Sequence, residues 1–210
     1  MDSVGRVAAL HRPARKKLFE QMIVAVDVGN PLLGRAGASR VYGPQKGLKE
    51  YQLAERCLRR LAHVAERELG HDFARSPGAG AAGGLAFGLA AFASGELESG
   101  FDVFARVARL ERHLRWSDLV ITGEGSVDPS TLMGKGVGQL ARRCREMRKP
   151  CVAVGAVVKR NRPLHNIFDG IWPLTDLAGV EEAKSRAAFW LTKLTEQVAE
   201  SAARIPGRKS

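Results

Sequence analysis

The sequence lacks several features that would assign a chain to a class at once. Its three cysteines form no C-x-x-C pair, which argues against a disulfide framework and against a structural zinc site. No apolar run approaches the roughly 18 residues that a membrane span requires, and the first residues lack the apolar core of a secretory signal. The five histidines are scattered, without a Ser-His-Asp order or metal-ligand spacing. We therefore expect a cytoplasmic protein with reduced thiols and no membrane contact.

The sequence has fewer acidic than basic residues. The chain has 33 Lys and Arg against 22 Asp and Glu, a net charge of +11, which favours acidic partners such as nucleic acid. The basic residues lie mostly along amphipathic segments, as Arg106, Arg109 and Arg112 do, and aromatic residues do not interleave with them as base stacking requires. We therefore do not expect a nucleic-acid partner, but a solvated basic surface that can attract anionic metabolites.

Short apolar runs alternate with amphipathic segments along the chain, which predicts an α/β fold with a parallel sheet. The predicted strands are 22–28, 119–122, 151–158 and 171–174. The predicted helices are 48–69, 101–116, 137–147 and 180–205. The expected organisation is a lead-in segment (1–21), an α/β lobe with glycine-rich loops (22–116), a second lobe (117–205) and a disordered tail (206–210).

Two segments in the first half of the chain are candidates for anion binding. In residues 29–34 two glycines follow a strand, but Arg35 and Ala36 stand where a P-loop needs Lys and then Ser or Thr. We reject a P-loop, and a simple shaped turn is the alternative. In residues 43–47, Lys46 could meet an anion at the N-terminus of a helix, or the segment is a plain helix entry.

The glycine-rich loop of residues 78–84 matches G-x-G-x-x-G, but its surroundings do not fit a dinucleotide site. Residues 71–77 are not an apolar strand, and no strand-borne acidic residue for a ribose follows about 20 residues later. The bare backbone N–H groups of such a turn can still approach a phosphate closely. The alternative is that the glycines only allow tight packing of a buried helix.

Residues 121–128 carry the most suggestive pattern, because two carboxylates, Glu124 and Asp128, follow a predicted strand directly. Ligands of open parallel sheets collect beyond the carboxyl ends of the strands. The two carboxylates could coordinate Mg²⁺ or position a hydroxyl, and Lys135 could neutralise phosphate charge. Alternatively, Asp128 caps a helix that begins at Pro129.

Five segments, taken in order, resemble the glycerate kinase type I family. They are DVGNPLLG (27–34), GAS (37–39), YGPQKG (42–47), PGAGAAGG (77–84) and ITGEG (121–125). The resemblance extends over about residues 23–174. It implies an α/β protein of two lobes, one a partial flavodoxin-like lobe with a parallel sheet and the other an α/β lobe with a mixed sheet.

The resemblance also implies a reaction, in which the γ-phosphoryl group of ATP is transferred to a hydroxyl of D-glycerate with Mg²⁺ as a cofactor. On that basis Asp128, Glu124 and Lys135 are the expected catalytic residues, and Asp128 and Glu124 the expected Mg²⁺ ligands. The expected substrate-binding and phosphate-binding residues are Asp27, Asn30, Lys46, Gly78, Gly80, Gly83, Gly84, Gly123 and Gly125.

The sequence departs from the family in two respects. The Ser-Phe-Lys-Gly, Asp-Gly-Gly-Glu-Gly-Thr and Gly-Gly-Ser-Ala-Thr-Asn-Asp-Gly-Gly segments of the N-terminal half are not in this sequence, and Asp128-Pro129-Ser130 stands where Asp-Gly-Gln is usual. We therefore expect a truncated or partial enzyme, with a homodimer or a separate N-terminal half covering its sheet edges. The alternative is a non-catalytic metabolite-binding or interaction module that pairs with such a half.

Overall fold

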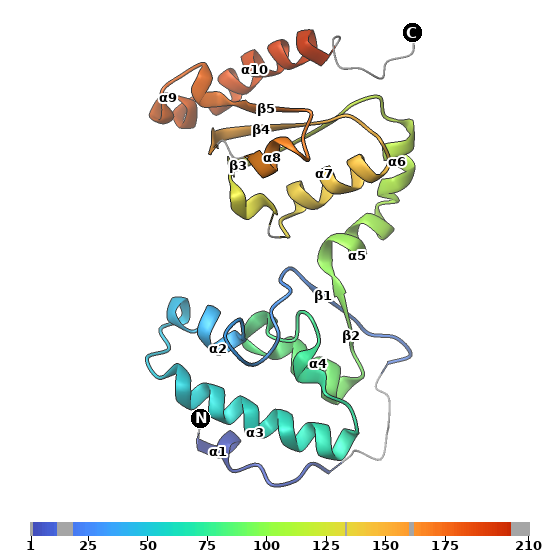
Figure 1. Ribbon diagram of the computed structural model, residues 1–210, viewed down its shortest axis with the longest axis vertical. Coiled ribbons are helices and arrows are strands. Elements are labelled where there is room, and N and C mark those ends of the chain that lie inside the picture. The colour runs from blue at the N-terminus through green and yellow to red at the C-terminus, as the bar shows by residue number, and fades with distance from the viewer. Residues whose placement is uncertain (1, 12–18, 133, 160–161, 203–210) are drawn as a thin grey trace. The chain divides into compact units, whose positions relative to one another are not determined.

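The chain forms two compact units, Met1–Phe104 and Ala105–Ser210, each with its own parallel sheet and its own buried core (Figure 1). The computed structural model describes residues 2–11, 19–132, 134–159 and 162–202. The tail expected at 206–210 lies outside the described residues. Strands and helices alternate within each unit, which confirms the α/β class. No helix in the described part of the chain is both long and apolar enough to cross a membrane.

The first unit contains two parallel strands, with Ile23 opposite Glu96 in the register. The strands are β1 (Ile23–Val26) and β2 (Glu96–Ser99). The helices are α1 (Asp2–Gly5), α2 (Ala38–Val41), α3 (Tyr51–Leu69) and α4 (Leu85–Ala93), and the 3-10 turns are η1 (Pro44–Lys46), η2 (Phe73–Arg75) and η3 (Ala81–Gly83). Helix α5 (Gly100–Val107) begins in the first unit and ends in the second. The sheet expected to be mixed is, over the described residues, this parallel pair.

The core of the first unit lies where α3 and α4 pack against the loop after β1. Ala62 and Ala65 of α3 contact a cluster that includes Leu32 and Phe87, both almost fully buried. Helix α3 ends as the sequence predicts, because Gly70 adopts a left-handed conformation (φ 77°) and donates its N–H to Glu66. The glycine-rich loops are therefore fixed to the long helix at the base of this unit (Figure 1).

The second unit is a three-stranded parallel sheet with β4 in the centre. Its strands are β3 (Val120–Val127), β4 (Cys151–Val158) and β5 (Gly170–Pro173). Its helices are α6 (Leu110–Trp116), α7 (Gly136–Glu146), α8 (Arg162–His165), α9 (Val180–Ser185) and α10 (Ala187–Ala202), and its 3-10 turns are η4 (Pro129–Leu132) and η5 (Leu174–Asp176).

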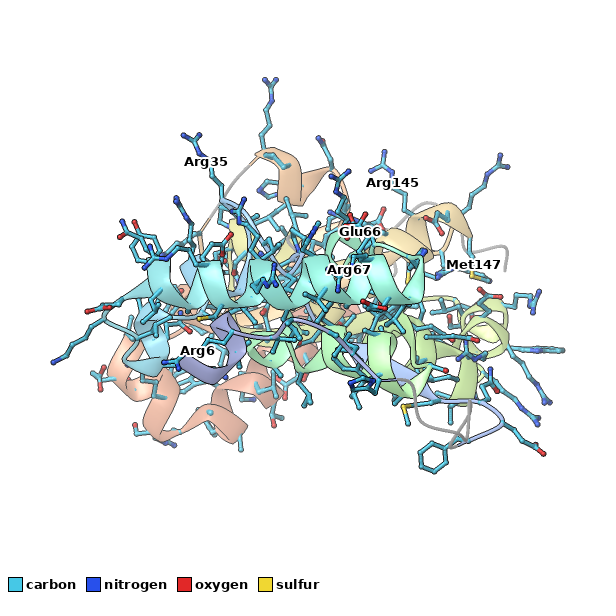
Figure 2. The ribbon with its side chains drawn as sticks, turned by 90° about the horizontal axis from the view of Figure 1, so that it is seen from below. Arg6, Arg35, Glu66, Arg67, Arg145 and Met147 are labelled. Atoms are coloured by element: carbon cyan, nitrogen blue, oxygen red, sulfur yellow. The ribbon has the colours of Figure 1, made fainter. Side chains whose placement is uncertain are left out.

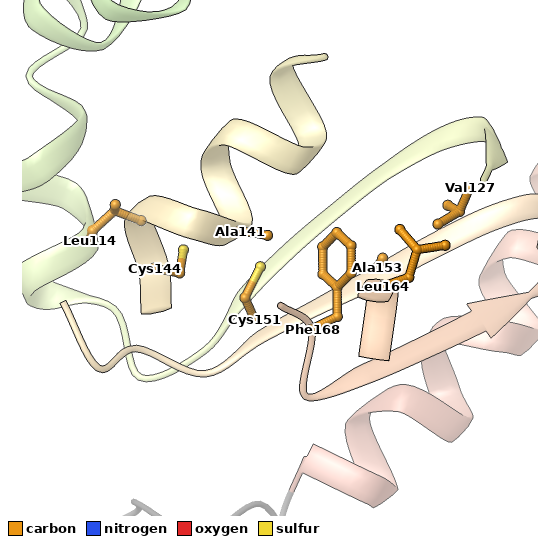
Figure 3. Close-up of a cluster of buried hydrophobic side chains, with 8 residues drawn as sticks. All are labelled: Leu114, Val127, Ala141, Cys144, Cys151, Ala153, Leu164 and Phe168. Carbon is orange, nitrogen blue, oxygen red and sulfur yellow. The ribbon is translucent and has the colours of Figure 1, made fainter. Parts of the chain in front are cut away.

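Both faces of β4 are buried, which is why its sequence is continuously apolar rather than alternating. Cys151 and Ala153 face a cluster formed with α7 and α8 (Figure 3), and Val152 and Val154 face a cluster formed with α9 and α10. Helices therefore cover the central strand on both sides of the sheet.

Two long helices predicted from periodicity are each broken in the structure. The helix expected over 101–116 is divided into α5 and α6, because Arg109 adopts a left-handed conformation (φ 51°). The helix expected over 180–205 is divided into α9 and α10 at Arg186, whose φ of −123° is not helical. Apolar spacing continues through both breaks, so the pattern could not reveal them.

Leu164 of α8 provides a test of the second core, since its side chain is fully buried in the cluster formed with α7 and β4. Leu164→Ala should lower the free energy of unfolding by about 2–5 kcal/mol, because it leaves a cavity. Leu191→Ala, at a side chain that is 43% exposed, is the control and should change it by less than about 0.5 kcal/mol. Tryptophan fluorescence during urea unfolding reports this transition, since all three tryptophans lie in the second unit. Equal shifts for the two variants would contradict the prediction.

Candidate functional site

Strand β3 extends to Val127, beyond the end predicted at Thr122, because β4 pairs with it along its full length. Glu124 therefore projects from a strand rather than from a loop. A Cβ atom on Gly123 would lie 2.6 Å from the carbonyl oxygen of Val154, so the close approach of the two strands requires glycine there. Gly125 faces open space. These two glycines lie in the sheet, on either side of the first candidate carboxylate.

The carboxylate of Glu124 is held by two partners. Its Oε2 forms an ion pair with Lys135 Nζ at 3.1 Å, and its side chain is only 17% exposed. Its Oε1 accepts a hydrogen bond from the hydroxyl of Thr131, a residue that is fully buried. The same hydroxyl accepts the backbone N–H of Asp128 at 3.1 Å. Thr131 therefore links the two predicted carboxylates, using its donor on one and its acceptor on the other.

Asp128 caps the 3-10 turn η4, as the alternative interpretation of the sequence proposed. Its Oδ1 accepts the backbone N–H of Ser130 at 2.8 Å and the Ser130 hydroxyl, and its Oδ2 accepts the Ser126 hydroxyl at 3.3 Å. The hydrogen bonds from Ser130, with smaller effects from Ser126 and Lys135, outweigh desolvation and lower the pKa of Asp128 below its ordinary value. The carboxylate is therefore ionised at neutral pH.

Lys135 stands at the N-cap of α7, and close packing determines its position. A Cβ atom on Gly138 would lie 2.0 Å from the carbonyl oxygen of Thr131, so the first turn of α7 rests directly on η4. This contact places the lysine beside Glu124. The structure thus brings together the three residues that the sequence analysis selected as catalytic. It also adds three that the analysis missed: Ser126, Ser130 and Thr131.

The donor set bears on whether Mg²⁺ fits here. Within the described residues there is no group of three or more His, Cys, Asp or Glu side chains that could hold a metal ion. Mg²⁺ in nucleotide sites is usually held by one or two carboxylates together with substrate phosphates. Asp128 fits that arrangement, since it is ionised and only partly buried. Glu124 fits it less well, because Lys135 and Thr131 already engage both of its oxygens.

In the first unit, Asn30 joins three of the loops that the sequence analysis selected. Its backbone oxygen accepts the N–H of Gly80 at 2.9 Å. Its side-chain Oδ1 accepts the hydroxyl of Tyr42 at 2.6 Å, and its Nδ2 donates to the carbonyl of Ala36 at 2.8 Å. Burial, with a smaller effect from the negative charge of Asp27, raises the pKa of Tyr42. Asp27 and Asn30 therefore belong to one local cluster.

The glycines of the loop at 78–84 serve packing and turn geometry. A Cβ atom on Gly78 would lie 2.6 Å from Val26 Cγ2, and one on Gly80 would lie 2.4 Å from the carbonyl oxygen of Pro31. Gly83 and Gly84 adopt left-handed conformations, with φ of 73° and 101°. The N–H groups of Gly80, Gly83 and Gly84 all donate to carbonyl oxygens of the first unit.

Lys46 lines a pocket of about 420 Å³, together with other residues of the loops at 43–47 and 78–84. The pocket is lined mainly by apolar side chains from α2 and α3, with Lys46, Gly47 and Gly83 on its wall. Ser39 also lines it, and the buried hydroxyl of Ser39 has no hydrogen-bond partner among the described residues. The loops at 43–47 and 78–84 therefore share one hollow within the first unit.

The two parallel sheets, with charged side chains at the carboxyl end of a strand, define an α/β protein of the class in which ligands bind beyond the carboxyl ends of the strands. Comparison with known proteins specifies that class: the chain belongs to the glycerate kinase family, whose profile matches residues 4–203.

Two curated relatives illustrate the similarity. Glycerate 2-kinase of Escherichia coli is 41% identical over 133 residues, which are 62% of this chain and 35% of that protein. Glycerate kinase of Bacillus subtilis is 33% identical over 183 residues, which are 85% of this chain and 48% of that protein. The chain thus spans less than half the length of either relative.

A solved structure shows the same relation. A crystal structure assigned to glycerate kinase 2 of Salmonella typhimurium LT2 matches with a TM-score of 0.62 and 32% sequence identity. The match covers 81% of this chain and 44% of the other. The fold of this chain is therefore that of part of a glycerate kinase.

The hydrogen bonds to Asp128 lead to a prediction about its pKa. Ser130→Ala removes the hydroxyl that lowers this pKa most, so the pKa should rise toward the ordinary value, but only in part because the Ser130 N–H remains. The lowered pKa stabilises the fold above the unfolded-state pKa, and this contribution is lost as the pH falls from the unfolded-state pKa to the folded-state pKa. In Ser130→Ala the contribution should be smaller, and its loss in acid should be complete at a higher pH. Carboxyl ¹³C NMR titration measures the pKa. Ser126→Ala, which removes the longer 3.3 Å bond, should raise it less, and the reverse order would contradict the assignment.

Proposed function

We propose that this chain supplies part of the phosphate-handling machinery of an ATP-dependent D-glycerate kinase. The observation that carries the proposal is the network of Glu124, Thr131, Asp128 and Lys135 around the carboxyl end of β3, in a chain of the glycerate kinase family. Phosphoryl transfer depends on positioning and charge neutralisation more than on covalent chemistry by the protein. A fixed cation beside an ionised carboxylate meets both needs.

Lys135 is the proposed phosphate contact. Its ammonium group lies at the start of α7, where the backbone N–H groups of the helix add partial positive charge. Glu124 holds the lysine by their ion pair, and Thr131 orients Glu124 in turn. Glu124 is therefore proposed as a positioning residue.

Asp128 is the proposed Mg²⁺ ligand, since its ionised carboxylate lies in the same network as Lys135. When bound with ATP, Mg²⁺ supplies charge neutralisation on the phosphate oxygens. In the first unit, we propose that Lys46 contacts an anionic part of a substrate at the pocket beside Gly83. Asp27 and Asn30 are proposed to shape the surrounding loops.

A second candidate function is a non-catalytic module that binds a metabolite or pairs with a separately encoded half. It is favoured by the share of the relatives that this chain spans, 35% and 48% in the two cases. It is also favoured by the open edge of β3, which pairs only with β4 among the described strands and carries Ile121 with 52% of its surface exposed. The two functions differ in whether this chain alone binds ATP and turns it over.

Substitution of Lys135 tests the proposed phosphate contact. Lys135→Gln should weaken ATP binding about tenfold or more in isothermal titration calorimetry, because it removes a charge-assisted hydrogen bond. Lys184→Gln is a matched control, since Lys184 forms an exposed ion pair of 3.0 Å with Glu181 in the same unit. Its ATP affinity should equal that of the unsubstituted chain. Equal weakening in both variants would mean that only net charge matters.

Coupled measurement of ADP release with ATP, Mg²⁺ and D-glycerate separates the two functions. Turnover that is abolished by Asp128→Ala would exclude the non-catalytic module. Absence of both turnover and ATP binding in the unsubstituted chain would exclude a kinase role for this chain alone.

A further inference from the structure

A second concave site lies in the second unit, at the edge of the sheet opposite to Asp128. A hollow of about 360 Å³ opens beside the turn that joins α7 to β4. Asp128 follows the carboxyl end of β3, whereas residues 148–150 precede the amino end of the parallel strand β4. In a parallel sheet all the amino ends of the strands lie on one side and all the carboxyl ends on the other, so the hollow is separate from the proposed phosphotransfer site.

Basic side chains dominate the wall of this hollow. Arg145, Arg148 and Lys149 come from the end of α7 and the turn after it, and His165 comes from the end of α8. Within the described part of the chain, neither arginine has an acidic partner at ion-pair distance, and Figure 2 shows Arg145 projecting from the ribbon. Guanidinium groups present several donors in a fixed plane that matches phosphate. The two arginines are therefore available to an anion.

The backbone of Arg148 gives an independent reason to assign its side chain a role. Helix α7 ends in a Schellman motif, in which Arg148 N–H donates to Arg145 at 3.0 Å and Lys149 N–H donates to Cys144 at 2.8 Å. Arg148 occupies the left-handed position of that motif, with φ of 54°, where glycine is the usual residue. A side chain retained in a costly conformation at the wall of a pocket points to a function of that side chain.

The other charged groups of the hollow are held in place. Lys149 Nζ donates to the carbonyls of Arg115 at 2.8 Å and Ser117 at 3.0 Å, so it forms a fixed wall. Asp169 Oδ2 accepts the N–H of Cys151 at 2.7 Å. A carboxylate offers about four acceptor positions, so Asp169 can still accept a hydroxyl hydrogen. The hollow thus combines donors for a phosphate with an acceptor for an alcohol.

We propose that this hollow binds a small phosphate monoester that carries a free hydroxyl group. Arg145 and Arg148 contact the phosphate oxygens, and Asp169 accepts a hydrogen bond from the hydroxyl. Such an ester places its neutral hydroxyl group, rather than its charged phosphate, against the carboxylate of Asp169. The site is independent of the proposed kinase reaction, because it shares no residue with the network around Glu124.

Calorimetric titration of the full chain with sn-glycerol 3-phosphate tests the proposal, at an ionic strength that screens distant surface charges. Glycerol 3-phosphate should bind more tightly than inorganic phosphate, and glycerol should not bind. Arg145→Gln and Arg148→Gly should each weaken binding by about tenfold or more, because each removes charge-assisted hydrogen bonds. Glycine suits the left-handed backbone at position 148, so the second variant retains the fold even if the first does not.

Three further variants complete the test. Arg112→Gln on α6 changes net charge equally outside the hollow and should leave the dissociation constant unchanged. Lys135→Gln should also leave it unchanged, since that residue belongs to the other site. Asp169→Asn should remove the preference for the ester over inorganic phosphate. Equal weakening by Arg112→Gln, loss of binding in Lys135→Gln, or unchanged affinity in both arginine variants of the hollow would overturn the proposal.

Discussion

The pairing of β3 with β4 is the constraint on which the second unit depends. It runs in one register from Val120 opposite Cys151 to Val127 opposite Val158. The register is specified because β4 is buried on both faces, so a slip of one residue would exchange the side chains that face α7 with those that face α10. Because this ladder is long, Glu124 lies within β3 and Asp128 directly follows its carboxyl end. It also fixes the turn of residues 148–150 at the other edge of the sheet.

The buried hydroxyl of Thr131 connects the end of this strand pair to the carboxylates of the site. Thr131 is fully buried, and a buried hydroxyl without partners would cost free energy. It avoids that cost by donating to Glu124 and accepting from the N–H of Asp128. The need to satisfy one polar group therefore sets the relative position of two carboxylates. The position of Lys135 at the start of α7 depends on the same packing, because Gly138 lets α7 approach the carbonyl of Thr131.

The α/β class and the three charged residues Glu124, Asp128 and Lys135 could be predicted from the sequence, because apolar runs and charged residues that follow a strand are local signals. Features that depend on partners distant in the sequence could not. Strand β3 was predicted to end at Thr122, since Gly123 and Gly125 resemble a turn until the pairing with β4 is known. Strand β2 was not predicted, because Glu96–Ser99 has no apolar run and is a strand through its pairing with β1.

Backbone breaks form a second class of features that periodicity does not show. Arg109 and Arg186 interrupt helices within continuous apolar patterns, and Arg148 takes a left-handed conformation that a sequence pattern assigns to glycine. Thr131 was missed for a different reason, since a buried hydroxyl between two polar partners has no one-dimensional signature. The nearest signal was the group of hydroxyl residues that surrounds Asp128 in the sequence.

The glycine-rich loop of the first unit shows how a motif can be explained by packing before chemistry is invoked. Gly78 and Gly80 are required because Val26 and the carbonyl of Pro31 leave no room for a Cβ atom. A cradle for phosphate needs N–H groups that point at the ligand, but the N–H of Gly80 is already bound to Asn30. The loop therefore serves to fix the backbone of Asn30, whose side chain accepts the hydrogen bond from Tyr42. Among the described residues that line the pocket beside Gly83, Lys46 has the charged side chain, so selectivity for an anion in that pocket would depend on this lysine.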